Sequence, residues 1–334
     1  PHIQNTSINE LKNNLKEDEI FSQIIITNFS VINILVVKSE IQVYVKLVQE
    51  FNLIFEEFSN EVQKDSSSNI KELNNDISLL IGMELIRELV NNNYNTLYVC
   101  LDNRMGLYPI TSVEIGGIAL IDKVKSVINI IDYSIVGKKE ENLINNEGQI
   151  VNRILGNNAD NNLIKINNWL SENRMDNFIV LDNVSDEINT LTELDVSLLI
   201  LYGHGISDPN STVIAGAIGI EGQKKLIDLE TLLEELPKIN NLILVSCRGG
   251  MLNNIHPEKS SGVWATILEK FEGNIISCKW DVPTKSSIVL INELVKVLSE
   301  GNIKLSEALL LAQKRTKQEF ANINEWAGLQ FWMN

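Results

Sequence analysis

The stretch Val196-Ser197-Leu198-Leu199-Ile200-Leu201-Tyr202-Gly203-His204-Gly205 is an apolar run that ends at a histidine between two glycines. A second run, Leu242-Ile243-Leu244-Val245, ends at Ser246-Cys247-Arg248-Gly249-Gly250. Short, continuous apolar segments closed by glycines are typical of parallel strands that are buried on both faces. The sequence therefore predicts two buried strands, each followed directly by a residue that can carry chemistry.

The segment between the two runs predicts a helix. Asp228 can cap it, and leucines at 229, 232, 233 and 236 follow the i, i+3, i+4, i+7 spacing, with Pro237 as a stop. A strand, a helix and a strand form a right-handed crossover that makes the strands parallel neighbours in one sheet. We therefore expect His204 and Cys247 to lie side by side at the carboxyl ends of their strands, where open α/β sheets place their sites.

A histidine beside a cysteine is the arrangement that nucleophilic catalysis by sulfur requires. A free thiol is only slightly ionised at neutral pH, and the histidine can take its proton and later return it to a leaving amine. The flanking glycines leave room for a substrate backbone, and the N–H groups of Gly205 and Cys247 are candidates for an oxyanion hole. The pattern predicts cysteine-dependent acyl transfer.

Other interpretations of these residues remain open. A histidine at a strand end is often a structural hydrogen-bonding residue, and a cysteine that ends an apolar run is often part of the core. The chain would then be an inactive binding module, or an interaction subunit whose acidic surface recruits partners. The run Gly216, Gly219 and Gly222 does not indicate a nucleotide site, because no Lys-Ser/Thr pair follows it.

The ordered set of motifs resembles the caspase-like cysteine peptidases, and more closely their bacterial relatives, the CHAT domains. The resemblance rests on an ordered set of segments: Leu97 to Asp102 with Leu107-Tyr108-Pro109, His204-Gly205, Ser246-Cys247-Arg248-Gly249, the run Asn274 to Trp280 with Val282, and the closing segments Glu307 to Gln313 and Trp326 to Leu329. Together they extend from about residue 18 to the end of the chain.

The resemblance implies an α/β fold with a caspase-like, mainly parallel sheet flanked by helices. It implies that residues 18–124 form a degenerate, non-catalytic caspase-like half and that residues 125–334 form the catalytic half. Residues 1–17 are expected to be a linker or the tail of a preceding region. Cys100 is the only cysteine of the first half and has apolar neighbours, so we interpret it as a core residue.

For function, the resemblance implies a cysteine endopeptidase that cleaves a protein substrate through His204 and Cys247. The specificity pocket is expected around Asp132, Val245, Trp280 and Asp281. Carboxylates there favour cleavage after arginine or lysine. Val245 is not acidic, so a bulky apolar residue is the second choice.

The same resemblance implies regulation. CHAT domains commonly follow sensor or repeat segments in longer bacterial proteins that act in defence or signalling. We therefore expect a regulatory partner or a fused sensor domain to order the loops at 209–225 and 248–260. A chain that begins at Pro1 fits a segment of such a protein.

Composition narrows the function classes. The formal charge of −16 disfavours direct nucleic-acid binding. Three scattered cysteines do not indicate a disulfide framework, which favours a reducing cytoplasm. No apolar run is long enough for a membrane span. His2 lies in the tail and His256 in a polar loop, so neither a metal site nor a cofactor is expected.

Periodicity predicts the remaining elements. They are an antiparallel meander over 20–47, helices over 48–62 and 70–91, strands over 96–101 and 125–131, a surface loop over 136–146, helices over 150–155 and 163–170, a strand over 178–181, a loop or hairpin over 209–225, and helices over 288–299 and 305–320. Phe51, Phe55, Phe58 and Val62 form one stripe, which we expect to pack in the core.

Overall fold

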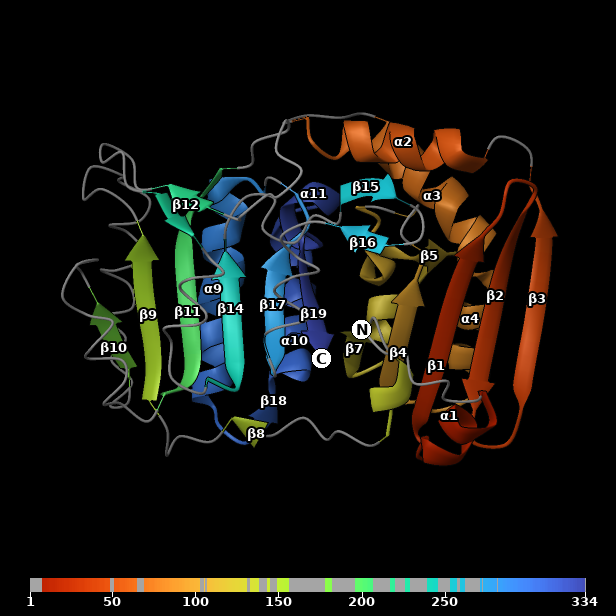
Figure 1. The fold of residues 1–334 in the computed structure, drawn as a ribbon, viewed down its shortest axis with the longest axis horizontal. Coiled ribbons are helices and arrows are strands. Elements are labelled where there is room, and N and C mark those ends of the chain that lie inside the picture. Colours follow the sequence, from red (N-terminus) through yellow and green to blue (C-terminus); the bar gives the residue numbers. More distant parts are fainter. Residues whose placement is uncertain are drawn as a thin grey trace.

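The computed structural model describes residues 8–48, 51–64, 69–102, 105, 107–130, 133–137, 143–144, 149–155, 178–181, 196–206, 217–219, 226–228, 239–245, 253–256, 259–261, 271, 273–280 and 282–333. Its centre is a sheet of thirteen strands (Figure 1). Eleven follow the order β10-β9-β11-β14-β17-β19-β7-β4-β1-β2-β3, and β12 and β13 extend the sheet from β11.

The main strands are β1 Glu19–Ile26, β2 Ser30–Val37, β3 Ile41–Leu47, β4 Thr96–Leu101, β7 Ser126–Asn129, β9 Gln149–Leu155, β10 Phe178–Leu181, β11 Val196–Ile206, β12 Ala217–Gly219, β13 Leu226–Asp228, β14 Asn241–Val245, β17 Asn274–Cys278 and β19 Leu329–Met333. Along the eleven-strand path, the antiparallel pairs are β1–β2, β2–β3 and β17–β19. The remaining neighbours on this path run parallel, which confirms the expected α/β fold with a mainly parallel sheet.

Short two-stranded pairs and helices complete the described structure. The pairs are β5 Glu114–Ile115 with β6 Ile118–Ala119, β8 Leu143–Ile144 with β18 Ile303–Lys304, and β15 Asn253–His256 with β16 Lys259–Ser261. The α-helices are α1 Ile8–Asn14, α2 Phe51–Glu61, α3 Ile70–Ile81, α4 Met83–Asn91, α9 Thr284–Ser299, α10 Leu305–Glu319 and α11 Ile323–Trp326. The 3-10 turns are η2 Ile110–Ser112, η3 Leu120–Asp122 and η4 Tyr133–Ile135.

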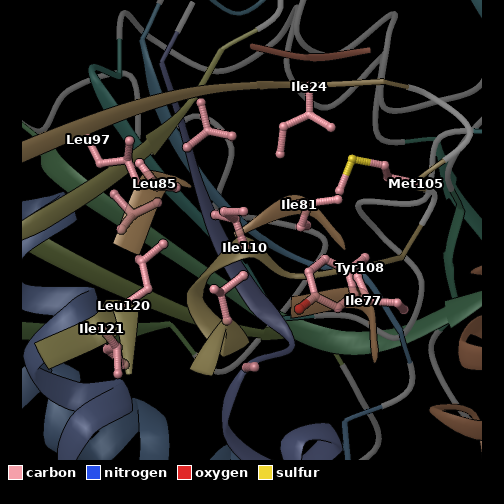
Figure 2. Packing of buried hydrophobic residues seen from close by; sticks show 14 of the residues in the cluster. Ile24, Ile77, Ile81, Leu85, Leu97, Met105, Tyr108, Ile110, Leu120 and Ile121 are labelled. Carbon is pink, nitrogen blue, oxygen red and sulfur yellow. The ribbon is translucent and has the colours of Figure 1, made fainter. Parts of the chain in front are cut away.

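Successive side chains along the strands belong alternately to two hydrophobic clusters. On β4, Leu97 and Val99 belong to one cluster, and Tyr98 between them belongs to the other, as the period of two in a strand requires. The first cluster contains residues of α2, α3 and α4, and the second contains residues of α1, α9 and α10. Figure 2 shows Ile77 and Ile81 of α3 and Leu85 of α4 in the first cluster. The sheet is therefore covered by helices on both faces.

The C-terminal strand β19 joins the two parts of the sheet. It runs antiparallel to β17 on one side and parallel to β7 on the other. The buried Asn129 of β7 donates through Nδ2 to the main-chain oxygen of Phe331, 2.9 Å away, and to Oε1 of Gln330, 3.3 Å away. An element from the end of the chain thus completes the link between the strands of residues 19–129 and those of residues 149–278.

The predicted meander matches the structure, and the aromatic stripe is buried at Phe55, Phe58 and Val62, the positions whose side chains are described. β1, β2 and β3 form the antiparallel meander. Phe55 and Phe58 are 3% and 0% exposed, and their rings lie 5.9 and 5.1 Å from that of Tyr108. The helix expected over 70–91 is divided at Gly82 into α3 and α4. A Cβ at this position would lie 2.4 Å from Val113, so the glycine allows that side chain to approach.

Other segments also differ from what the sequence predicted. Within the expected linker, residues 8–14 form α1, and Leu11 and Leu15 are 1% exposed in the core. The segment 149–155, expected to be helical over 150–155, is strand β9, since it pairs with both β10 and β11. The expected loop over 136–146 contains β8, which pairs with β18. The helices predicted over 163–170 and after Asp228 lie outside the described residues; Asp228 itself ends β13.

Candidate active site

The two apolar runs that frame the candidate site form β11 and β14, which are parallel neighbours. Their register pairs Leu199 with Leu242 and continues to Tyr202 opposite Val245. Leu242, Leu244 and the intervening Ile243 are all 0% exposed, as expected for a strand covered on both faces. The carboxyl ends of β11 and β14 therefore reach the same edge of the sheet. In Figure 1 the arrowheads of β9 and β14 point to this edge.

His204 lies beyond the part of β11 that pairs with the main strands. The last pairs that β11 makes with its main-sheet neighbours are Gly203 with Leu155 on β9 and Tyr202 with Val245 on β14. The strand does not stop at the glycine, as the sequence suggested, but continues to Ile206. Its final residues pair with the short antiparallel strand β12, and His204 stands opposite Gly219.

The region after His204 contains a hairpin formed by β12 and β13. β12 pairs antiparallel with β13, and both strands lie in or directly after the segment expected to be loop or hairpin. Gly205, the candidate oxyanion-hole residue, stands opposite Ile218 of this hairpin. The backbone around the predicted histidine is thus part of a three-stranded ladder at the edge of the main sheet.

Cys247 lies outside the described residues, together with Ser246 and the glycines that follow it. Its position along the chain can nevertheless be counted from the last described residue of β14. Cys247 is two residues beyond Val245, and His204 is two residues beyond Tyr202, the residue opposite Val245. The two predicted catalytic residues therefore have the same offset from one pair in the parallel ladder.

The strand order independently indicates this edge as a candidate binding position. From β9 the chain continues to β10 on one side, and then returns to β11 on the other side of β9. In open α/β sheets, ligands bind outside the carboxyl ends of strands where the strand order reverses in this way. The reversal lies between β9 and β11, and β11 carries His204.

The residues expected to form a specificity pocket are only partly described. Asp132 and Asp281 lie outside the described residues. Val245 is 4% exposed at the end of β14, and Trp280 is fully buried. The Nε1 group of Trp280 donates to the main-chain oxygen of Asn324, 3.0 Å away, so this indole is anchored to α11. The specificity pocket stays a prediction.

A buried lysine close to this edge was missed by sequence reasoning. Lys279 directly follows β17, the neighbour of β14, and is 3% exposed. Its Nζ donates to the main-chain oxygen of Tyr108, 3.2 Å away, and lies 5.7 Å from the centre of the Trp332 ring. Burial lowers the pKa of Lys279 to about 7. A sequence signal was present, because this lysine interrupts an apolar run that ends in tryptophan.

The two other cysteines provide internal comparisons for Cys247. Cys278 is 2% exposed at the end of β17, and Cys100 on β4 is partly buried; both are free of disulfide bonds. Within the described ranges, no group of three or more His, Cys, Asp or Glu residues could hold a metal ion. In the same ranges, no helix combines the length and the apolar composition that a membrane crossing requires.

Comparison with known proteins identifies a fold but not a family. No family model matches the sequence, and no curated protein matches it. Among solved structures, a chain of the Saccharomyces cerevisiae separase–securin complex is similar, with a TM-score of 0.67 at 9% sequence identity. The match covers 97% of this chain and 30% of the separase-complex chain, so the present chain spans less than a third of that neighbour. The likeness shows a caspase-like α/β fold.

Proposed function

We propose that this chain is a cysteine endopeptidase of the caspase-like type, with Cys247 as the nucleophile and His204 as its base. The observation that carries the proposal is the parallel register of β11 and β14, in which Tyr202 stands opposite Val245. Each proposed catalytic residue follows this pair by two positions. The strand reversal between β9 and β11 supports the same edge, and the fold shared with the separase-complex chain supports the caspase-like type.

The proposed reaction proceeds through an acyl-enzyme. The Cys247 sulfur attacks a peptide carbonyl carbon while His204 takes the thiol proton, and the N–H groups of Gly205 and Cys247 stabilise the oxyanion. Collapse of this intermediate breaks the peptide C–N bond, and His204 returns the proton to the leaving amine. Water, deprotonated by His204, then attacks the thioester and releases the acid and the free thiol.

Specificity for a basic residue before the cleaved bond is the preferred proposal for the pocket. Asp132 and Asp281 would supply carboxylates that can pair with a guanidinium bidentately. Val245 and Trp280 would supply apolar walls; in the structure Val245 belongs to one buried cluster and the fully buried Trp280 to the other. A pocket for a bulky apolar residue is the second candidate, since Val245 carries no charge.

The proposed setting is a regulated bacterial protease of the CHAT type in a reducing cytoplasm. Its substrate is a protein, and a regulatory partner or a fused sensor segment activates it in defence or signalling. The similar solved chain comes from a separase–securin complex, which supports a protein partner for this chain. We expect weak activity from the chain by itself.

A peptide library cleaved by the wild-type chain tests the activity, and variants test the assignment. Cys247→Ala should abolish cleavage, and His204→Ala should reduce turnover by orders of magnitude, because members of one catalytic unit cannot be removed separately. Cys278→Ala and Cys100→Ala serve as controls that retain cleavage. An inactive binding module would cleave none of the peptides. If the wild type and Cys247→Ala then both bound a partner stably, the chain would be a binding module and not a peptidase.

A further inference from the structure

The outer side of β3 is one of the two unpaired ends of the eleven-strand path in the described part of the chain, and β10 forms the other. β3 pairs with β2 through all seven of its residues, and no described strand pairs with its other side (Figure 1). The strand contains no proline and no glycine. An edge of this kind presents a row of main-chain N–H and C=O groups that can pair with another chain.

The side chains on one face of β3 are apolar and exposed. Val43 and Val45 are each 59% exposed, and Leu47 is 86% exposed. Ile41 begins the same row and packs partly against the core cluster that contains α1. Native edge strands are usually shortened or protected by charges, prolines or bulges on the exposed row. This row has none of these features.

The sequence of β3 is complementary to itself in antiparallel pairing. With Tyr44 opposite Tyr44 of a second copy, Val43 stands opposite Val45 and Ile41 stands opposite Leu47. Directly opposite residues share one face of a sheet, so each exposed apolar side chain meets another apolar side chain. The alternate row remains polar on both copies. A shift of this register by one residue would place the apolar rows on opposite faces.

Charges on the other face favour the same register. Gln42 of one copy stands opposite Lys46 of the other, and Glu40 lies diagonally across from that Lys46. Lys46 is also 3.5 Å from Glu84 of its own α4, so the ammonium lies between carboxylates rather than beside another cation. Like charges directly opposite each other are absent from this register. The same strand thus offers apolar and electrostatic complementarity to a copy of itself.

We infer that β3 is a dimerisation strand, pairing antiparallel with β3 of a second copy about a two-fold axis at Tyr44. One seven-residue strand pair is a small interface compared with the standard of about 800 Å² per partner, so the dimer is weak and reversible. The formal charge of −16 on each copy opposes association, and salt screens that repulsion. The dimer therefore becomes more populated as ionic strength rises.

Cysteine cross-linking tests the register directly. Directly opposite residues in an antiparallel pair have Cα atoms about 4.5 to 5.5 Å apart, within the range that a disulfide spans. Tyr44→Cys should therefore form a disulfide dimer on mild oxidation. Gln42→Cys is the matched control, since its copy lies roughly 13 Å away along the strand. A mixture of Gln42→Cys and Lys46→Cys should cross-link, whereas each variant separately should not.

Sedimentation equilibrium supplies the second readout. The wild-type dimer should increase from about 0.05 M to about 0.5 M salt, and Val45→Lys should raise the dissociation constant at least about tenfold. Leu311→Lys, on α10, is the control at another exposed leucine and should leave it unchanged. A monomer at every concentration with no Tyr44→Cys cross-link overturns the inference and leaves this edge for a strand of another protein. A dimer that Val45→Lys does not weaken overturns it as well.

Discussion

Lys279 donates a hydrogen bond from its buried Nζ to the main-chain oxygen of Tyr108, a residue 171 positions away in the sequence. The contact joins the end of β17, which neighbours the β14 strand of the candidate site, to the loop that follows β4. A cation in this position is costly, because burial removes its water and no carboxylate among the described residues pairs with it. The lowered pKa of about 7 expresses that cost.

Stability should rise with pH because of Lys279. The folded-state pKa of about 7 lies below the ordinary value of 10.5, so the unfolded chain binds more protons between these values. Stability contributed by this group is therefore lowest at and below pH 7 and increases towards pH 10.5. Lys279→Met should be more stable than wild type at pH 7 by on the order of several kcal/mol, with the difference shrinking as pH rises.

Urea unfolding at a series of pH values checks the Lys279 prediction. Lys123→Met, at an exposed lysine, is the control and should show a small and constant difference from wild type. A constant difference between wild type and Lys279→Met across pH 7 to 10 would mean that Lys279 does not titrate as burial requires.

Phe58 should be among the most costly core positions to truncate. Its side chain is fully buried, and its ring lies 5.1 Å from that of Tyr108. Phe58→Ala should lower the free energy of unfolding by about 3 to 5 kcal/mol. Leu53→Ala, on the same helix but at a side chain 56% exposed, should change it by less than about 1 kcal/mol. Equal losses in chemical denaturation would contradict the packing of α2 given above.

Gly137 should report on the packing of α1. It has a φ of +69°, and a Cβ there would lie 2.1 Å from the main-chain oxygen of Asn14 at the end of α1. Gly137→Ala combines a left-handed backbone with this clash and should cost about 2 to 4 kcal/mol. Gly116→Ala has a similar φ of +59° but open space, so it should cost only about 1 to 2 kcal/mol. Thermal unfolding that ranks the two variants in the opposite order would contradict the docking of α1.

The sequence correctly predicts those elements whose apolar pattern fits only one type of secondary structure. The run from Leu242 to Val245 is too short for a helix and is closed by a glycine-rich segment, and it forms β14. The alternation at Ile41, Val43, Val45 and Leu47 fits a strand period and forms β3. The stripe at Phe55 and Phe58 fits a helix period and forms the buried side of α2.

Other features could not be predicted from local sequence, because they depend on contacts with residues that are distant along the chain. Ile150, Val151, Ile154 and Leu155 have a spacing that suits a helix face, but pairing with β10 and β11 makes this segment a strand. The burial of Lys279 depends on Tyr108 and Trp332, which no local pattern near position 279 reveals. For the candidate site, sequence predicted the neighbouring strands, and their register adds the equal offset of His204 and Cys247 from one residue pair.

The rate at which Cys247 is alkylated, measured by mass spectrometry across pH, tests the proposed pairing with His204 most directly. We expect Cys247 to react faster near pH 7 than Cys100 and the buried Cys278, because a neighbouring imidazole can take the thiol proton. His204→Ala should slow that reaction by about tenfold or more and move its pH dependence towards the free-thiol pKa of about 8.5. Alkylation of Cys247 at the same rate in both proteins, with an unshifted profile, would contradict the account.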